Sequence, residues 1–317
     1  MYVIVHDAFK QIAMPKSTSE HIGKVFSFLN LDKNEDFSES SNKKSLLIPF
    51  AQTRVTGFNI MIIGSRPSNG RTLFLNELLI ANTIFRLTEN RFETLEPCRS
   101  LAYFLTEKPV NYFNKLIPGI LGINQETLRW NKFFRESADF HRAIHELDIV
   151  LPRRPLFLEF SLPADLEEFR AAIESDIKAS NPDFIFIDGL EILAQPEKPE
   201  YELHGTRNID VWLDACLELN AKHSIPFVIT RLLNPQNDRS FDVFQPVFSD
   251  FNSSAIDSAC DIVVSMVRPA LCGIQDESDR NNQKNTVRFL VHRDRTGVLS
   301  GEYRCEVENE IPRMVFP

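Results

Sequence analysis

Residues 65–72 combine the residue types and the spacing of a loop that binds phosphate. An apolar run at Ile60–Ile63 has the length and branched side chains of a buried strand. A turn of small and polar residues follows, and a helical pattern begins at Arg71 and Thr72. A turn between a strand and a helix N-terminus directs main-chain N–H groups toward one point, where phosphate oxygens bind. The sequence therefore predicts a phosphate-binding loop, and a connection without a ligand is the alternative.

Two carboxylates are expected at the same edge of the sheet as this loop. Glu107 follows the strand predicted over 100–106, and Asp188 ends the strand predicted over 184–188. Ligands of open parallel sheets bind beyond the carboxyl ends of the strands. A nucleotide-hydrolysing site needs a phosphate loop, a hydroxyl and an acid that hold Mg²⁺, and a second acid that orients water. Taken singly, Asp188 is also typical of a turn former and Glu107 of a solvated acid, but the features in this order indicate a nucleotide site.

The composition narrows the class of protein. The chain has 317 residues, of which 43% are hydrophobic and 25% charged, as in globular proteins. A net charge of −9 argues against broad electrostatic attachment to DNA or to an anionic membrane, but not against a local basic lining in a ring. No apolar run approaches the roughly 18 residues of a membrane helix, and no secretory signal is visible. With five cysteines that lack metal-type spacing, we expect a cytoplasmic protein without a membrane partner.

Strands and helices alternate from Phe58 onward, which predicts a parallel sheet covered by helices. The expected strands are 60–63, 100–106, 156–160, 184–188, 226–230 and 262–267, followed by a pair at 286–292 and 302–307. The expected helices include 72–87, 163–177 and 208–222, with further helical segments between 110 and 148. Residues 1–56 are expected to form an N-terminal arm with one short helix and a polar linker, and residues 57–317 one domain.

From about residue 55 onward, the chain resembles the RecA-like motor domain of bacterial replicative DNA helicases of the DnaB type. The segments that carry the resemblance are, in order, GSRPSNGRT, LAYFLTEK, PLFLEFSLPADLEEFR, DFIFIDGLEIL, SIPFVITRLLN, SDFNSSAIDSACDIVVSMVR and HRDRTG. Several motifs in one order are more specific than any single motif. The resemblance implies an α/β, RecA-like P-loop NTPase fold, with a mainly parallel twisted sheet flanked by helices and a C-terminal β-hairpin.

The resemblance also implies roles for individual residues around one nucleotide. ATP would be held by the loop residues Ser65, Pro67, Ser68, Asn69, Gly70, Arg71 and Thr72. Thr72 and Asp188 would hold Mg²⁺, and Glu107 would polarise the attacking water.

Three arginines are implied to act together with these residues. Arg231 takes the place of the family's sensor glutamine, and Arg293 and Arg295 would reach the nucleotide of a neighbouring subunit. A site shared in this way implies a ring or filament of copies of this chain, with a hexamer among the options. Single-stranded DNA and replication proteins are the other partners that the resemblance implies.

The sequence departs from the family pattern at the loop itself. The usual pattern has Gly at the position of Ser65 and Lys at the position of Arg71. Arginine keeps the charge, but it is longer, planar and forked, so it does not occupy the compact position of lysine. Because arginine binds phosphate bidentately, we expect phosphate binding to persist. Hydrolysis depends on positioning, and we expect it to suffer severely.

The loops that face DNA in this family are acidic in this chain. The loops after Asp188 and Thr230 carry Glu197, Glu200, Glu202, Asp238 and Asp242, which is a poor surface for a phosphate backbone. The second region also holds Phe241, Phe244, Phe248 and Phe251. These rings are suited to stack on bases, and packing on apolar neighbours or on a protein is the alternative.

Two classes of function follow from these residues. We expect an ATP-linked role of the helicase or translocase type, in DNA replication or in a mobile element. The residues that favour it are Glu107, Asp188, Arg293 and Arg295. A hydrolysis-impaired scaffold or nucleotide sensor that acts through protein–protein interaction is the rival, and Arg71, Arg231 and the acidic loops favour it. A small-molecule kinase is disfavoured, because no lid-like basic segment is visible.

Overall fold

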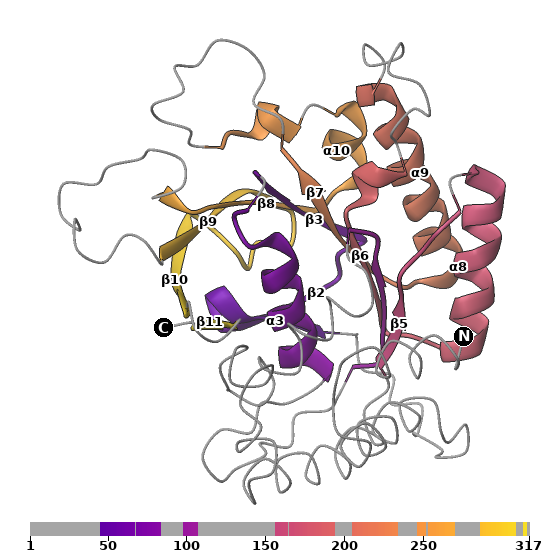
Figure 1. Ribbon diagram of the computed structural model, residues 1–317, viewed down its shortest axis with the longest axis horizontal. Coiled ribbons are helices and arrows are strands. Elements are labelled where there is room, and N and C mark those ends of the chain that lie inside the picture. Colours follow the sequence, from indigo (N-terminus) through magenta and orange to yellow (C-terminus); the bar gives the residue numbers. More distant parts are fainter. Residues whose placement is uncertain are drawn as a thin grey trace, which may run out of the picture.

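Figure 1 shows the protein as a computed structural model. The structure describes residues 45–66, 68–83, 98–106, 156–163, 165–193, 205–233, 246–251, 253–269, 286–308 and 313–315. The predicted arm helix and polar linker, and the helical segments between 110 and 148, lie outside these ranges.

A nine-stranded sheet forms the centre of the described part. Its order is β11-β10-β9-β8-β3-β7-β6-β4-β5. The parallel strands are β3 (Ile60–Ser65), β4 (Ser100–Phe104), β5 (Leu156–Glu159), β6 (Phe184–Asp188), β7 (Phe227–Leu232) and β8 (Ile262–Val267). The antiparallel strands are β9 (Thr286–Asp294), β10 (Glu302–Glu308) and β11 (Arg313–Val315). The sheet confirms the predicted fold class: it is mostly parallel and it carries the predicted C-terminal hairpin, β9–β10.

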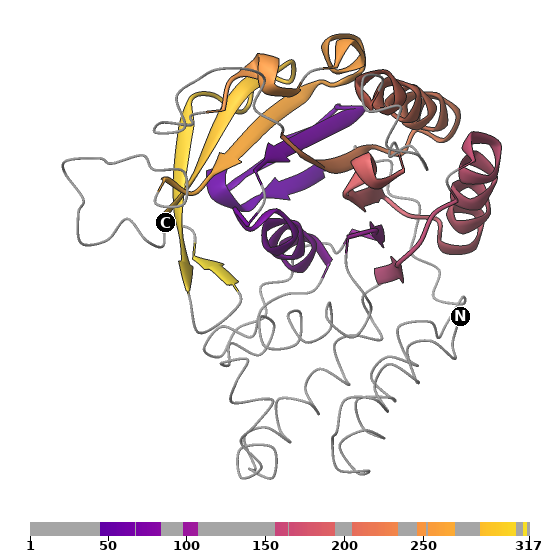
Figure 2. The same cartoon turned by 45° about the horizontal axis from the view of Figure 1, so that its top comes forward.

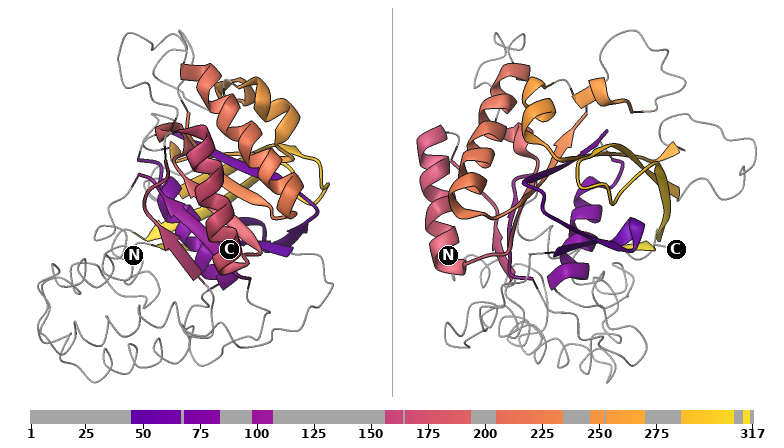
Figure 3. Two further views of the ribbon diagram at one scale, coloured as in Figure 1. Left: turned by 90° about the vertical axis from the view of Figure 1, so that its right-hand side faces the viewer. Right: turned by 180° about the vertical axis from the view of Figure 1, so that it is seen from behind.

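Helices cover both faces of this sheet. Helix α3 (Arg71–Thr83) lies on one face, and α8 (Leu166–Ser180), α9 (Gly205–His223) and α10 (Ser254–Ala259) lie on the other (Figures 1 and 2). The left view of Figure 3 shows the face covered by these three helices, where α9 lies between α8 and α10. Because a parallel sheet is buried on both faces, its central strands read as continuous apolar runs, and every residue of β3, β6 and β8 is buried.

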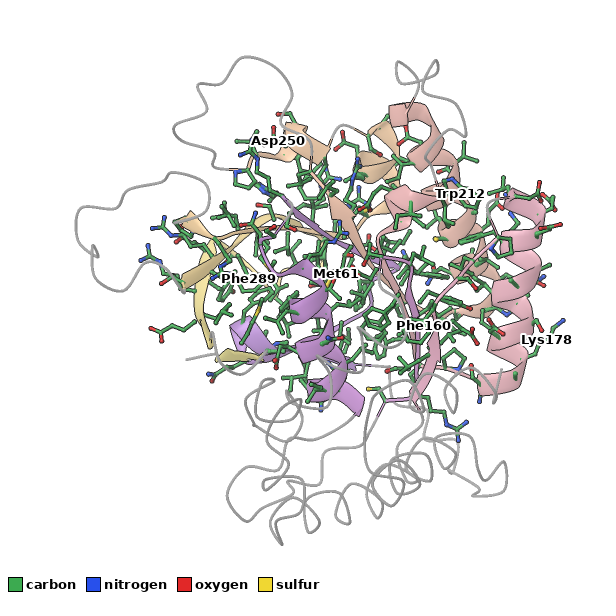
Figure 4. The ribbon with its side chains drawn as sticks, viewed as in Figure 1. Met61, Phe160, Lys178, Trp212, Asp250 and Phe289 are labelled. Atoms are coloured by element: carbon green, nitrogen blue, oxygen red, sulfur yellow. The ribbon has the colours of Figure 1, made fainter. Side chains whose placement is uncertain are left out.

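Alternation along each strand divides the core into two layers. Met61 and Ile63 pack in the layer toward α3, and Ile60 and Ile62 pack in the layer toward α8 and α9. Figure 4 shows Trp212, which belongs to the second layer, and Lys178 at the outer side of α8. No helix in the described ranges is long and apolar enough to cross a membrane.

A hairpin absent from the sequence-based prediction precedes the sheet. Strands β1 (Ser45–Ile48) and β2 (Thr53–Thr56) pair antiparallel, with a single helical turn between them. The sequence predicts these residues as part of the arm, whereas their apolar side chains pack in the core layer of α3. Each strand has only four residues, which is too short to give a clear alternation pattern. Strand β11 was missed for the same reason, since it has three residues.

The ring of Phe50 anchors this hairpin. It is 2% exposed and stacks on Phe289 with 4.5 Å between ring centroids. We expect Phe50→Ala to lower the free energy of unfolding by about 3 kcal/mol, because it leaves a cavity in a close-packed core. Urea unfolding measures this, and the exposed Thr56→Ala on the same hairpin is the control. Equal unfolding midpoints for the two variants would show that residues 45–56 are an arm after all.

Candidate functional site

The candidate site lies at the carboxyl edge of the parallel strands. Strands β3, β7, β6 and β4 are neighbours and run in the same direction, so their last residues meet at one edge. Ser65 ends β3, Asp188 ends β6, and Thr230 of β7 pairs with Asp188 in the ladder. The predicted phosphate loop therefore opens next to the predicted metal-site acid.

The loop forms a tight bend between β3 and α3. Ser68 and Gly70 have φ angles of 65° and 90°, in the left-handed region that lets the chain reverse within a few residues. Asn69 fixes the bend: its Oδ1 accepts from the Arg268 amide at 2.9 Å, so the loop is tied to the chain that leaves β8. Helix α3 begins immediately after the bend, because the Phe74 main-chain amide donates to the Gly70 carbonyl at 2.8 Å.

The residues predicted to hold ATP therefore lie together in this bend, apart from Pro67. Ser65 is buried, and its hydroxyl donates to the Arg66 carbonyl at 3.1 Å. Pro67 lies outside the described residues. Their role in holding ATP stays a prediction.

Asp188 is the centre of a buried cluster of hydroxyl groups. Its side chain has no exposed surface. Oδ2 accepts from Thr72 Oγ1 at 2.7 Å and from Thr106 Oγ1 at 2.7 Å, and Oδ1 accepts from Thr230 Oγ1 at 2.5 Å. The predicted pair Thr72 and Asp188 is therefore in direct contact. Thr106 and Thr230 were missed, although each is a hydroxyl residue near the end of a predicted strand, which is the available signal.

Arg71 also turns toward this carboxylate. Its Nε lies 3.4 Å from Asp188 Oδ1, and its Nη1 lies 2.8 Å from Oε1 of Glu191. Glu191 belongs to η3 (Leu190–Ile192), a single turn that follows Asp188. The Arg71 side chain is only 11% exposed, so both contacts lie in a partly desolvated environment. Glu191 was missed from the sequence; its spacing of three residues after Asp188 is a weak signal.

The turn that presents Glu191 depends on Gly189. This residue has a φ of 85°, and a Cβ added there would lie 2.4 Å from Thr106 Cγ2. The chain therefore leaves β6 in one conformation, close over Thr106, which places Glu191 beside the N-terminus of α3.

Arg231 is a buried arginine beside this cluster. Thr230 faces Asp188, so the next residue of the strand faces the opposite side, toward α9 and α10. Arg231 is 8% exposed, and within the described ranges its Nε and Nη1 have no hydrogen-bond partner. Burial lowers the pKa of Arg231, and the charges of Glu191 and Asp210 offset part of this effect. A buried cation with unsatisfied donors is costly and suggests a ligand, although its role as a sensor stays a prediction.

Arg293 and Arg295 lie at the opposite edge of the sheet from Asp188. Strand β9 is antiparallel to β8, so it ends where β8 begins. Both guanidiniums contact the C-terminal end of α10: Arg293 Nη1 donates to the Asp257 carbonyl at 2.8 Å, and Arg295 Nη2 donates to the same carbonyl at 2.6 Å. Positive groups are favourable at this end of a helix. Within one chain these arginines do not meet the phosphate loop, and their action on the nucleotide of another copy stays a prediction.

The remaining predicted residues are placed only in part. Glu107, predicted to polarise water, lies outside the described residues, as do Phe241 and Phe244. Phe251 is 1% exposed and packs in the core layer of α8 and α9, with Phe248 against it. For these last two rings, packing on apolar neighbours is the arrangement that the structure shows.

The contacts of Asp188 leave no place for a Mg²⁺ ion bound directly to this carboxylate while Arg71 lies against it. Hydroxyl and carboxylate oxygens are the ligands that Mg²⁺ prefers. Both oxygens of Asp188 already accept hydrogen bonds from threonine hydroxyls, and a guanidinium lies against one of them. A divalent ion bound directly to Asp188 would have to displace Arg71, whereas Thr72 Oγ1 keeps lone pairs for a metal ion while it donates to Asp188. Mg²⁺ at Thr72 and Asp188 therefore stays a prediction, and direct binding to Asp188 would require Arg71 to move.

Comparisons with known proteins agree with this fold. Residues 53–314 match the model of the DnaB-like helicase C terminal domain. A solved structure described as an ATPase domain has a TM-score of 0.59 and 17% identity, over 82% of this chain and 84% of that chain. "The Structure Of A DnaB-Like Replicative Helicase And Its Interactions With Primase" has a TM-score of 0.61 and 17% identity, over 82% of this chain and 59% of that chain. The curated proteins include no match. Since the family model covers most of its length, the chain belongs to the DnaB-like helicase C-terminal domain family.

Proposed function

We propose that this chain is an ATP-binding protein with a helicase- or translocase-type role in DNA replication or in a mobile element. The observation that carries the proposal is the contact of Thr72 Oγ1 with Asp188 Oδ2 at 2.7 Å, directly behind the bend at residues 65–72. This contact joins the first turn of α3 to the end of β6, so the loop and the acid form one site.

The loop would bind the triphosphate mainly through its main chain. Amides of residues 68–72 lie at the N-terminus of α3, where the helix dipole adds positive charge. Arg71 offers a planar fork that suits phosphate oxygens. Glu107 would orient water, and Arg231, at the sensor position, would respond to the bound phosphate from the other face of the sheet.

Self-association into a ring or filament is part of the proposal. Arg293 and Arg295 lie at the edge of the sheet opposite to the loop, which supports a role at the nucleotide of another copy. One similar structure is that of a DnaB-like replicative helicase and its interactions with primase. By analogy, we propose replication proteins and single-stranded DNA as partners of this chain.

A nucleotide sensor or scaffold without turnover is the second candidate. The contacts of Arg71 with Asp188 and Glu191 favour it, because they hold the loop cation against protein acids. A charge held in this way is poorly placed to follow the phosphate through an in-line displacement.

ATP turnover with and without single-stranded DNA separates the two candidates. We expect the wild type to bind ATP and turn it over slowly, with stimulation by DNA. Arg71→Lys should raise turnover by about tenfold or more, or roughly 1.4 kcal/mol, because the shorter cation frees the site for in-line transfer. The control is Arg304→Lys, an exposed arginine on β10. Binding without turnover in all three proteins favours the sensor, and a lack of ATP binding contradicts the proposal.

Arg231 gives a second prediction. We expect Arg231→Met to raise the free energy of unfolding without nucleotide by about 1 kcal/mol, because it removes a buried and unsatisfied charge. The same change should reduce the stabilisation that ATP provides. Thermal unfolding with and without ATP measures both effects, with Arg304→Met as the control. A loss of stability without ATP would show that Arg231 has a structural partner rather than a ligand.

A further inference from the structure

We propose that Arg71 is a built-in cation of the nucleotide site and takes the place of a divalent metal ion when ATP binds. The inference rests on the proposed ATP site and deepens it. It concerns how the charge of the triphosphate is neutralised, and it predicts that ATP binding does not depend on Mg²⁺.

The first step is that the buried charge of Asp188 already has its cation. A carboxylate with no exposed surface is stable only with hydrogen bonds and an opposite charge. Threonine hydroxyls supply hydrogen bonds to both oxygens but no charge. Within the described ranges, the positive group in contact with Asp188 is the Arg71 guanidinium, with Nε 3.4 Å from Oδ1. The cation that compensates this acid is therefore a side chain of the loop itself.

The second step is that Glu191 holds Arg71 in this position. The Arg71 Nη1 to Glu191 Oε1 distance of 2.8 Å is that of a charge-assisted hydrogen bond. Glu191 is 20% exposed, and its other oxygen is buried without a hydrogen-bond partner in the described part of the chain. If Arg71 left, both Glu191 and Asp188 would lose their ion-pair partner in a poorly solvated place. Glu191 is thus a positioning residue that acts through Arg71.

The third step is the balance of charge. The Arg71 guanidinium contacts both acids, through Nε to Asp188 and through Nη1 to Glu191. Both acids therefore face a cation before any ligand enters, which leaves less uncompensated negative charge to attract a divalent ion. A phosphate group instead meets a guanidinium fork of five donors, of which Nε and Nη1 face the two acids.

The guanidinium is also in reach of the loop. Arg71 is the first residue of α3 and follows Gly70, the last residue of the bend. Its Nη2 lies 3.6 Å from the position of a Cβ on Gly189, so the end of the fork lies over the turn between the two acids. A phosphate on the loop amides and the carboxylate of Asp188 therefore share one cation.

The test is a calorimetric titration of the full chain with ATP, once with excess Mg²⁺ and once with EDTA. We expect the wild-type dissociation constants to agree within about threefold. In Arg71→Lys, whose shorter point charge leaves Asp188 open to a metal ion, ATP should bind at least about tenfold more tightly with Mg²⁺. The control, Arg304→Lys, should behave like the wild type.

Each outcome bears on the inference. Wild-type binding that weakens about tenfold or more in EDTA overturns it and leaves the proposed ATP site intact. A lack of ATP binding under both conditions overturns the proposed site as well. Glu191→Gln tests the positioning role: a metal dependence that appears in this variant, but not in the exposed control Glu218→Gln on α9, supports it, and its absence in both contradicts that role.

Discussion

The site depends on one constraint, which is that the charge of Asp188 is fully buried and must be compensated. Hydroxyl groups come from α3, β7 and the turn that follows β4, and the opposite charge comes from Arg71. A buried carboxylate that lost these partners would be strongly destabilising, so the elements around it are held in one arrangement. The bend of the loop and the turn of η3 are both parts of this arrangement.

This constraint relates the unusual arginine of the loop, Arg71, to the residues that surround it. Arginine in place of lysine adds length and a planar fork, which reaches two acids at once. Glu191 supplies the second acid, and Gly189 fixes the turn that presents it. Arg231 then lies buried within the influence of Glu191, which partly offsets its desolvation. Arg71 thus pairs with both acids, an arrangement that suits a site which meets phosphate with its own cation.

Much of the fold was predictable, whereas the contacts within the site were not. Long apolar runs such as Ile60–Ile63 and 184–188 predicted the central strands, because burial on both faces leaves a clear pattern. The same strands placed Asp188 beside the loop, since parallel strands end at one edge. The four-residue strands β1 and β2 gave no pattern of this kind. Glu191 was missed because the partner of Arg71 depends on a single turn and on a glycine conformation, which spacing alone does not specify.

The most direct measurement is a crystal structure of the full chain with ATP in the presence of EDTA. We predict that the phosphates lie on the amides of residues 68–72, and that the Arg71 guanidinium lies between a phosphate oxygen and Asp188. Phosphates bound elsewhere on the chain, or an Arg71 side chain turned away from Asp188 when ATP is bound, would contradict this account.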